Sequence, residues 1–173
     1  MISTRGEVDL PNTSHATISG EKSDAGDNLG EDLRAKAAFL DWHNLGSKLL
    51  PEVITSVALL SGDGSPGSIR QVNFTPVVPF EYVKERLDHI DHEKLEVKIT
   101  LLEGGGLGKK IESASSYFKL ESKGSGSVVK FEGTHKVIPG ADISEELEKA
   151  KESLIATIKA TEGYLLANPN AYA

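Results

Sequence analysis

The strongest constraint on the fold is a long amphipathic segment near the C-terminus. Its apolar and small side chains recur at three- and four-residue intervals, at Leu147, Ala150, Leu154, Ile158, Thr161 and Leu165. This spacing predicts a helix of roughly 24 residues, about 36 Å long at a rise of 1.5 Å per residue. We expect Asp142 with Glu145, or Ser144 itself, to cap its start, and Asn168 followed by Pro169 to end it. A one-faced helix of this length needs a broad apolar surface to pack against.

The residues before this helix predict such a surface, in the form of an antiparallel sheet. Short connectors rich in glycine, proline or aspartate separate six strand-like runs, at residues 53–60, 69–74, 80–90, 95–102, 109–121 and 127–137. Short connectors favour hairpins, and therefore an antiparallel meander. Two short helices are predicted at residues 32–40 and 43–50. The pattern indicates an α+β fold in which a curved sheet receives the C-terminal helix.

The composition argues against several functional classes. The chain has 173 residues and no cysteine, which suits one domain without disulfides or thiolate metal sites. Its five histidines lack the spacing of a metal site, so we expect no metal and no cofactor. The net charge of −7, from 19 basic and 26 acidic side chains, disfavours binding to nucleic acid or to anionic membranes.

The hydropathy pattern bears on location. No apolar run approaches the ~18 residues of a membrane span, so we expect no membrane association. Residues 1–30 are polar and lack the apolar core of a secretory signal. We therefore expect an intracellular protein in the cytoplasm, with the nucleus as a second location.

Residues 1–31 differ from the rest of the chain. They carry two basic and six acidic side chains, and their hydrophobic residues are sparse. We expect this polar segment to be partly disordered and to hold the first strand of the sheet, at residues 14–21 or at residues 6–10. The folded domain is expected to span residues 32–173.

A glycine-rich loop lies between two of the predicted strands, and its key positions are Gly62, Gly64, Gly67 and Arg70. Its backbone amides could contact an anion, with Arg70 as a nearby cation. The loop lacks the helix and the Gly-Lys-Ser/Thr ending of a nucleotide-binding loop. Because a strand follows it, we interpret the loop as a rigid hairpin whose glycines serve geometry.

Several motifs in a fixed order resemble one plant family. They are residues 40–46 (Leu-Asp-Trp-His-Asn-Leu-Gly), 62–70, 79–88 (Pro-Phe-Glu-Tyr-Val-Lys-Glu-Arg-Leu-Asp), 90–92 (Ile-Asp-His), 102–108 (Leu-Glu-Gly-Gly-Gly-Leu-Gly) and 159–172. In these motifs the chain resembles the plant intracellular pathogenesis-related proteins of class 10, the family of the major birch pollen allergen, and most of all their monocot members. The resemblance covers about residues 35–173.

The resemblance implies a helix-grip fold: a seven-stranded curved antiparallel sheet wrapped around the long helix, two short helices and an internal hydrophobic cavity. It implies a plant defence or stress-response protein whose partner is an amphipathic small molecule bound in that cavity. The ligands implied are hormones such as cytokinins or abscisic acid, flavonoids, fatty acids and steroids. We expect such a protein to be mostly monomeric.

Strand alternation places Val97, Ile99 and Leu101 on one side of their strand. The resemblance turns that side toward the cavity and adds contacts from other elements. The expected ligand contacts are Phe39, Asn44, Phe74, Tyr82, Val97, Ile99, Leu101, Phe118, Leu154 and Ile158. Among these, Tyr82 and Asn44 are expected to supply polar contacts that orient the guest.

The resemblance also implies an alternative function, a ribonuclease that uses Glu112, Glu162 and Tyr164 with Arg70 as the loop cation. RNA cleavage needs a general base and a general acid. Glu162 and Tyr164 are two positions apart, about 200° around a helix, so they do not point at one substrate. A relative with Pictet–Spengler condensing activity shares the fold, but that reaction needs a lysine and acids inside the cavity. The inward positions are mostly apolar, so we expect ligand binding rather than catalysis.

Overall fold

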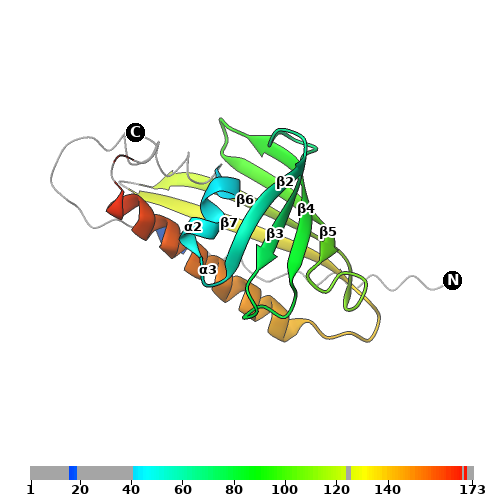
Figure 1. Cartoon of the computed structure of the whole chain (residues 1–173). Coiled ribbons are helices and arrows are strands. Elements are labelled where there is room, and N and C mark those ends of the chain that lie inside the picture. Colours follow the sequence, from blue (N-terminus) through cyan, green and yellow to red (C-terminus); the bar gives the residue numbers. More distant parts are fainter. Residues whose placement is uncertain (1–15, 19–40, 124–125, 169, 171–173) are drawn as a thin grey trace.

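The structure is a computed structural model that describes residues 16–18, 41–123, 126–168 and 170. The elements are β1 (Ala16–Ile18), α2 (Trp42–Leu49), β2 (Ile54–Ser61), β3 (Ile69–Phe74), β4 (Tyr82–Asp91), β5 (Glu96–Gly104), β6 (Ile111–Lys123), β7 (Gly126–Val137) and α3 (Ser144–Ala167). The strands of this described part form one antiparallel, seven-stranded sheet in the order β1-β7-β6-β5-β4-β3-β2 (Figure 1). The predicted combination of an antiparallel meander and a long C-terminal helix is confirmed.

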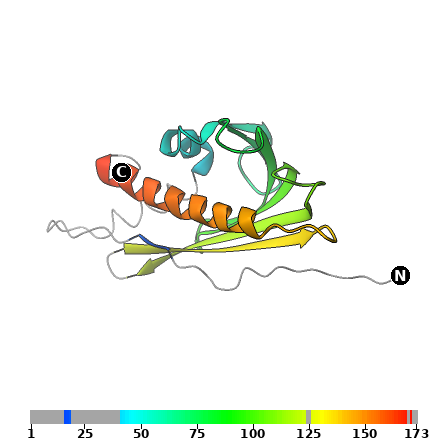
Figure 2. The same cartoon turned by 90° about the horizontal axis from the view of Figure 1, so that it is seen from below.

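The sheet is curved, and α3 lies across its concave face (Figure 2). Register shifts interrupt the pairing of β4 with β5 between Lys84 and Glu85 and between Leu87 and His89. The pairing of β2 with β3 is shifted twice as well. Such irregularities increase the local bend and twist of a strand, which brings the sheet around the helix.

Two separate apolar clusters hold α3 on the sheet. The Leu120 cluster contains Leu95, Leu120, Val129 and Ile158, with Leu154 packed against it. The Ile111 cluster contains Ile111, Ile143 and Leu147, with Leu101, Leu107, Ala114 and Val137 packed against it. Ile143, just before α3, and Leu147, in its first turn, belong to the Ile111 cluster. Leu154 and Ile158, further along the helix, belong to the Leu120 cluster. The helix is therefore anchored at two places rather than along a continuous core.

The observed strand ends differ from the predicted ones by one or two residues. β6 begins at Ile111 rather than at residue 109 because the amides of Lys109 and Lys110 both donate to the carbonyl of Gly106 in a turn. β1 lies inside the first of the two predicted positions for the opening strand, residues 14–21, and pairs with β7. The second position, residues 6–10, and the predicted helix at residues 32–40 lie outside the described residues.

The predicted capping of α3 is wrong, because the N-cap position is held by Ile143 and carries no side-chain cap hydrogen bond; Asp142, one residue earlier, instead closes a local turn. The Asp142 carboxylate accepts hydrogen bonds from the Ser144 amide, at 2.9 Å, and from the Ser144 hydroxyl, at 2.7 Å. These bonds, led by the one from the amide, lower the pKa of Asp142. Along the helix Leu147 and Ile158 are buried as predicted, whereas Ala150 is exposed because it lies at the edge of the apolar stripe.

Ion pairs cover the convex face of the sheet. They join neighbouring strands and include Lys84–Glu103, Lys119–Glu96, Lys130–Glu121 and Lys136–Glu112. Exposed pairs of this kind each contribute little to stability, about 0–1 kcal/mol. Their main consequence is a solvated outer face, which leaves the concave face as the place where the sheet buries its apolar side chains.

The glycine-rich loop is a hairpin between β2 and β3, as predicted. Gly62, Gly64 and Gly67 have positive φ angles of 82°, 93° and 95°. The loop amides are bonded within the protein: Gly64 donates to Ser68 Oγ at 3.0 Å, and Gly67 donates to the Leu87 carbonyl at 2.7 Å. Because these donors already have acceptors, the loop is closed as a hairpin and is not an open anion cradle.

Two glycine substitutions in this loop separate backbone strain from collision. Both Gly62→Ala and Gly64→Ala place a side chain at positive φ, and for Gly64→Ala we expect the free energy of unfolding to fall by about 1 kcal/mol. At Gly62 the added Cβ would also lie 2.2 Å from Ser68 Oγ, whereas at Gly64 it meets no atom within 4 Å. We therefore expect Gly62→Ala to cost about 2–4 kcal/mol. Urea unfolding followed by circular dichroism measures both, and equal losses would contradict this account.

Candidate functional site

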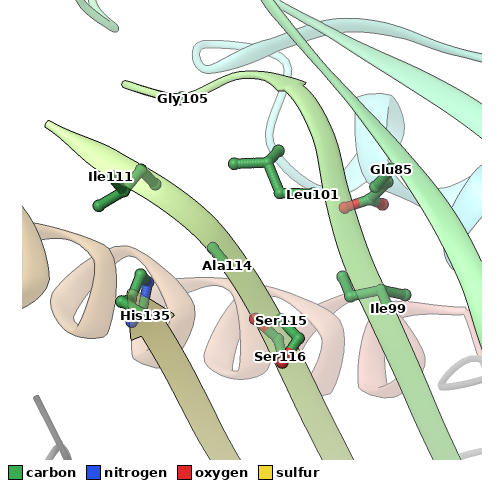
Figure 3. Close-up of a pocket in the computed structure, with 9 residues that line it drawn as sticks. All are labelled: Glu85, Ile99, Leu101, Gly105, Ile111, Ala114, Ser115, Ser116 and His135. Carbon is green, nitrogen blue, oxygen red and sulfur yellow. The ribbon is translucent and has the colours of Figure 1, made fainter. Parts of the chain in front are cut away.

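A pocket of about 170 Å³ lies on the concave face of the sheet. Its wall comes from β4 to β7 and the turn after β5, and the lining residues are Glu85, Ile99, Leu101, Gly105, Ile111, Ala114, Ser115, Ser116 and His135 (Figure 3). Three of them, Ile111, Leu101 and Ala114, also belong to the Ile111 cluster. The pocket therefore starts at the Ile111 cluster and extends along β5 and β6 toward the Leu120 cluster.

Strand alternation on β5 predicted two of the apolar residues of this wall, whereas Ile111 and Ala114 were not predicted. Ile99 and Leu101 line the pocket. Val97 lies two residues before Ile99, so it shares the face of that residue, and it pairs with Phe118 on β6. Phe118 in turn lies two residues beyond Ser116, which lines the pocket, so the apolar face continues past the pocket itself.

The other predicted contacts lie around the pocket. Leu154 and Ile158 point at the sheet, where they form part of the Leu120 cluster. Phe74 packs edge-to-face against Phe80, with ring centroids 5.3 Å apart. Phe39 lies outside the described residues. None of these described side chains lines the 170 Å³ pocket, so they extend the apolar surroundings rather than its wall.

Two predicted polar contacts are placed elsewhere by the structure. Tyr82 lies on the convex face, where its hydroxyl donates to the Glu103 carboxylate, and this hydrogen bond raises the pKa of the phenol. The ammonium group of Lys84 lies 5.3 Å from the centroid of the Tyr82 ring. Asn44 is exposed on α2 and donates to Asp41 Oδ1 at 2.5 Å. Neither side chain lines the pocket, because each has its partners on the outer surface.

Instead, the polar groups of the pocket come from residues that the sequence analysis missed. Glu85 is on β4 and His135 on β7, with Ser115 and Ser116 between them on β6. The missed signal at Glu85 is its position between Val83 and Leu87. Leu87 is buried and Val83 packs beside Leu101, so alternation places Glu85 on the same inner face.

Arg70 is buried inside the fold and pairs with Glu85. The two residues are direct partners in the register of β3 with β4, and Arg70 Nε donates to Glu85 Oε1. Their side chains are 9% and 11% exposed. This corrects the expectation of Arg70 as a loop cation, since its charge is turned inward and already compensated.

His135 is the second polar group at the wall. Its Nδ1 atom is buried and has no hydrogen-bond partner among the described residues. Burial lowers the pKa of the imidazole, because the surroundings disfavour its charged form. At neutral pH the side chain is therefore an uncharged group with one unused hydrogen-bonding atom.

The ribonuclease residues are not brought together. Glu112 is exposed on β6 and forms an ion pair with Lys136 on the convex face. The neighbouring Lys110 contacts Glu146 in the first turn of α3. Tyr164 lies 18 residues further along the same helix, which is about 27 Å at 1.5 Å per residue. Glu162 is near Tyr164 in the helix backbone, and nothing is described of its side chain.

Two general features were also searched for in the described residues. Within them, no helix combines the length and apolarity needed to cross a bilayer. The same residues contain no group of three or more His, Asp or Glu side chains placed to hold a metal ion.

A curved antiparallel sheet that wraps around a long helix (Figure 2), with a pocket on its concave face, defines a helix-grip protein of the ligand-binding type. The chain belongs to the Pathogenesis-related protein Bet v 1 family, whose family model matches residues 35–168. This membership confirms the resemblance found in the sequence. It supports, in general terms, a defence-related ligand-binding protein.

Relatives of known sequence agree with this assignment. The chain is 54% identical over 139 residues to Pathogenesis-related protein 1 of Asparagus officinalis, a match that covers 79% of this chain and 87% of that protein. It is 37% identical over 139 residues to the major pollen allergen Bet v 1-M/N of Betula pendula, with the same two coverages. The first of these relatives is a monocot protein, as the sequence motifs predicted.

Solved structures share the fold. The crystal structure of Ara h 8.0201 superposes with a TM-score of 0.74 at 26% identity and covers 94% of this chain and 100% of that chain. A point mutant of norcoclaurine synthase from Thalictrum flavum, in complex with a transition-state analogue, has a TM-score of 0.69 at 19% identity, with coverages of 98% and 100%. The second likeness concerns the fold alone.

The buried imidazole makes stability depend on pH. Because burial lowers the folded-state pKa of His135 below its unfolded value of about 6.5, the unfolded chain binds the extra proton as pH falls. We expect the free energy of unfolding to fall more between pH 7.5 and 5 for the natural chain than for His135→Phe. Urea unfolding at several pH values tests this. The matched control is His89→Phe, which replaces an exposed histidine outside the pocket.

Proposed function

We propose that this protein stores or carries an amphipathic plant metabolite or hormone in the pocket on the concave face of its sheet. The observation that carries this proposal is the pocket itself, which the strands β4 to β7 line on the concave face of the sheet, beside the Ile111 cluster. Aliphatic side chains of β5 and β6 supply the contact area. Glu85, His135 and Ser116 supply the few polar groups that orient a guest, since Ser116 is the β6 partner of the inward-facing Ile99.

The volume bears on the size of the guest. A cavity of about 150 Å³ holds a benzene molecule, so the pocket of about 170 Å³ suits one substituted aromatic ring or a fragment of similar size. Larger guests, such as flavonoids or steroids, would extend along the apolar face toward Val97 and Phe118. Burial of ~200 Å² of apolar surface contributes about 5 kcal/mol before the costs of ordering. This apolar contribution alone corresponds to a dissociation constant of roughly 0.2 mM, so micromolar binding also needs a longer apolar contact or hydrogen bonds to the polar groups of the pocket.

The cellular setting is part of the same proposal. We infer a role in defence or stress response, in the cytoplasm with the nucleus as a second location, and a mostly monomeric protein. The names of the pathogenesis-related relatives support the defence role. The ligand classes proposed are cytokinins, abscisic acid, flavonoids, fatty acids and steroids, and the following test samples two of them.

Displacement of a fluorescent guest tests the site. The uncharged fluorophore N-phenyl-1-naphthylamine is bound first, and a cytokinin and a flavonoid are then titrated against it. Ile99→Trp fills the pocket, and we expect it to weaken binding roughly tenfold or more. The matched control is Lys98→Trp, because Lys98 is the exposed neighbour on the same strand and points to the opposite face. If neither compound binds, or if both variants behave alike, the proposed site is wrong.

The ribonuclease alternative makes a separate prediction. If Glu112 acts in catalysis, Glu112→Gln abolishes RNA cleavage by a rigorously nuclease-free preparation. We expect instead that cleavage is the same for both proteins, because the ion pair to Lys136 on the convex face and the distance to Tyr164 leave no common centre. A complete loss of cleavage in the variant, with the fold intact, would favour the enzyme over the carrier.

A further inference from the structure

The concave face carries a transverse row of residues with polar ends and an apolar middle. Glu85 on β4 is paired with Leu101 on β5, and Ala114 on β6 is paired with His135 on β7. The β5–β6 register pairs Thr100 with Ser115, so its next step places Leu101 beside Ala114. All four members of the row line the pocket (Figure 3).

The row sets a length for the guest. Glu85 and His135 are separated by three strand spacings of about 4.8 Å, so their backbones lie about 14 Å apart across the sheet. Both side chains line the same pocket, which shortens the gap between their polar atoms. A single ring with a polar group at each end suits this gap and the volume of about 170 Å³.

The first end of the row is an acceptor. Arg70 donates to Oε1 of Glu85, and no other hydrogen bond to this carboxylate occurs in the described part of the chain. Glu85 lines the pocket, whereas Arg70 does not. Lys151 on α3 is also a half-buried cation, and it does not line the pocket either. The ion pair as a whole is neutral, and what it offers to a guest is a carboxylate oxygen that accepts a hydrogen bond from a donor.

The second end is His135, whose buried Nδ1 lacks a partner among the described residues. In one tautomer this atom accepts a hydrogen bond, and in the other it donates one. A hydroxyl group on the guest satisfies either tautomer. A buried polar atom without a partner is uncommon in native structures. Because Nδ1 has almost no accessible surface in this structure, the His135 ring turns about its Cβ–Cγ bond to bring this atom to a guest in the pocket.

We propose that the pocket selects an uncharged guest with a hydroxyl at each end, one bound by the Glu85 carboxylate and the other by His135 Nδ1. This inference deepens the proposed function and rests on it. It narrows the proposed ligand classes to neutral phenols and alcohols, because their hydroxyl groups can form hydrogen bonds with both Glu85 and His135. Carboxylates such as fatty acids have no donor for the Glu85 oxygen and place a second acceptor against it.

Three phenols of nearly equal shape test the two ends. They are 4-(2-hydroxyethyl)phenol, with a hydroxyl at each end, 4-ethylphenol, with one, and 4-hydroxyphenylacetate, with an anion at the second end. Each is titrated against the bound fluorophore near neutral pH. We expect the diol to bind about tenfold more tightly than either analogue, which is the value of one good hydrogen bond.

Variants of the two residues then show which of them binds each end of the guest. His135→Phe is expected to weaken the binding of the diol about tenfold and the binding of 4-ethylphenol much less, so that the variant binds the two compounds with similar affinity. The exposed histidine again provides the control, and His89→Phe should leave both affinities unchanged. Glu85→Gln removes the charge and is expected to reduce the preference for the diol over the anion. If this variant does not fold, Arg70→Gln with Glu85→Gln keeps the pair neutral and serves in its place.

The outcomes separate this inference from the proposed function. Equal affinities of the three phenols for the natural chain would overturn the inference, as would an equal loss of diol and 4-ethylphenol affinity in His135→Phe. Displacement by the cytokinin or the flavonoid but by none of the phenols would overturn the inference alone. Failure of the fluorophore, the cytokinin and the flavonoid to bind would remove the proposed function together with it.

Discussion

The attachment of α3 at two separate apolar clusters is the constraint on which the rest of the structure depends. If one continuous core filled the space between helix and sheet, the concave face would have no room for a guest. The Leu120 and Ile111 clusters instead fix the helix near both of its halves. The pocket begins at the Ile111 cluster and is lined by strands β4 to β7. Stability and binding capacity therefore come from the same arrangement, in different places along the helix.

The two faces of the sheet divide the chemistry of the protein. Ion pairs between neighbouring strands cover the convex face and satisfy its charges in contact with water. The concave face has the opposite character, with aliphatic side chains and a small number of buried polar groups. Glu112 and Tyr82 lie on the convex face with partners of their own. The residues that remain for function are those on the inside.

The sequence predicted the fold well and the polar part of the site poorly, for physical reasons. The C-terminal helix and the inward side of β5 follow from local periodicity, which needs no knowledge of distant residues. Tyr82 was expected at the cavity from the resemblance, but it alternates with the inward-facing Val83 and Glu85, and its hydroxyl lies beside Glu103 on the outer face. Glu85 counts as solvent-facing, and its burial depends on Arg70, which lies 15 residues earlier in the chain and becomes its neighbour only through strand pairing. His135 was missed because an unbonded ring nitrogen has no local signature.

The pairing of Arg70 with Glu85 has a consequence for how such a protein changes over evolutionary time. Loss of either partner leaves a buried charge without compensation, which costs about 3–5 kcal/mol in comparable pairs. Replacement of both at once by uncharged residues is often neutral. A substitution at only one of the two positions therefore gives a poorly folded protein, so the two residues are either both kept or both replaced. The charged pair at this end of the interior is therefore retained during sequence divergence, even where the surrounding aliphatic residues are exchanged for one another.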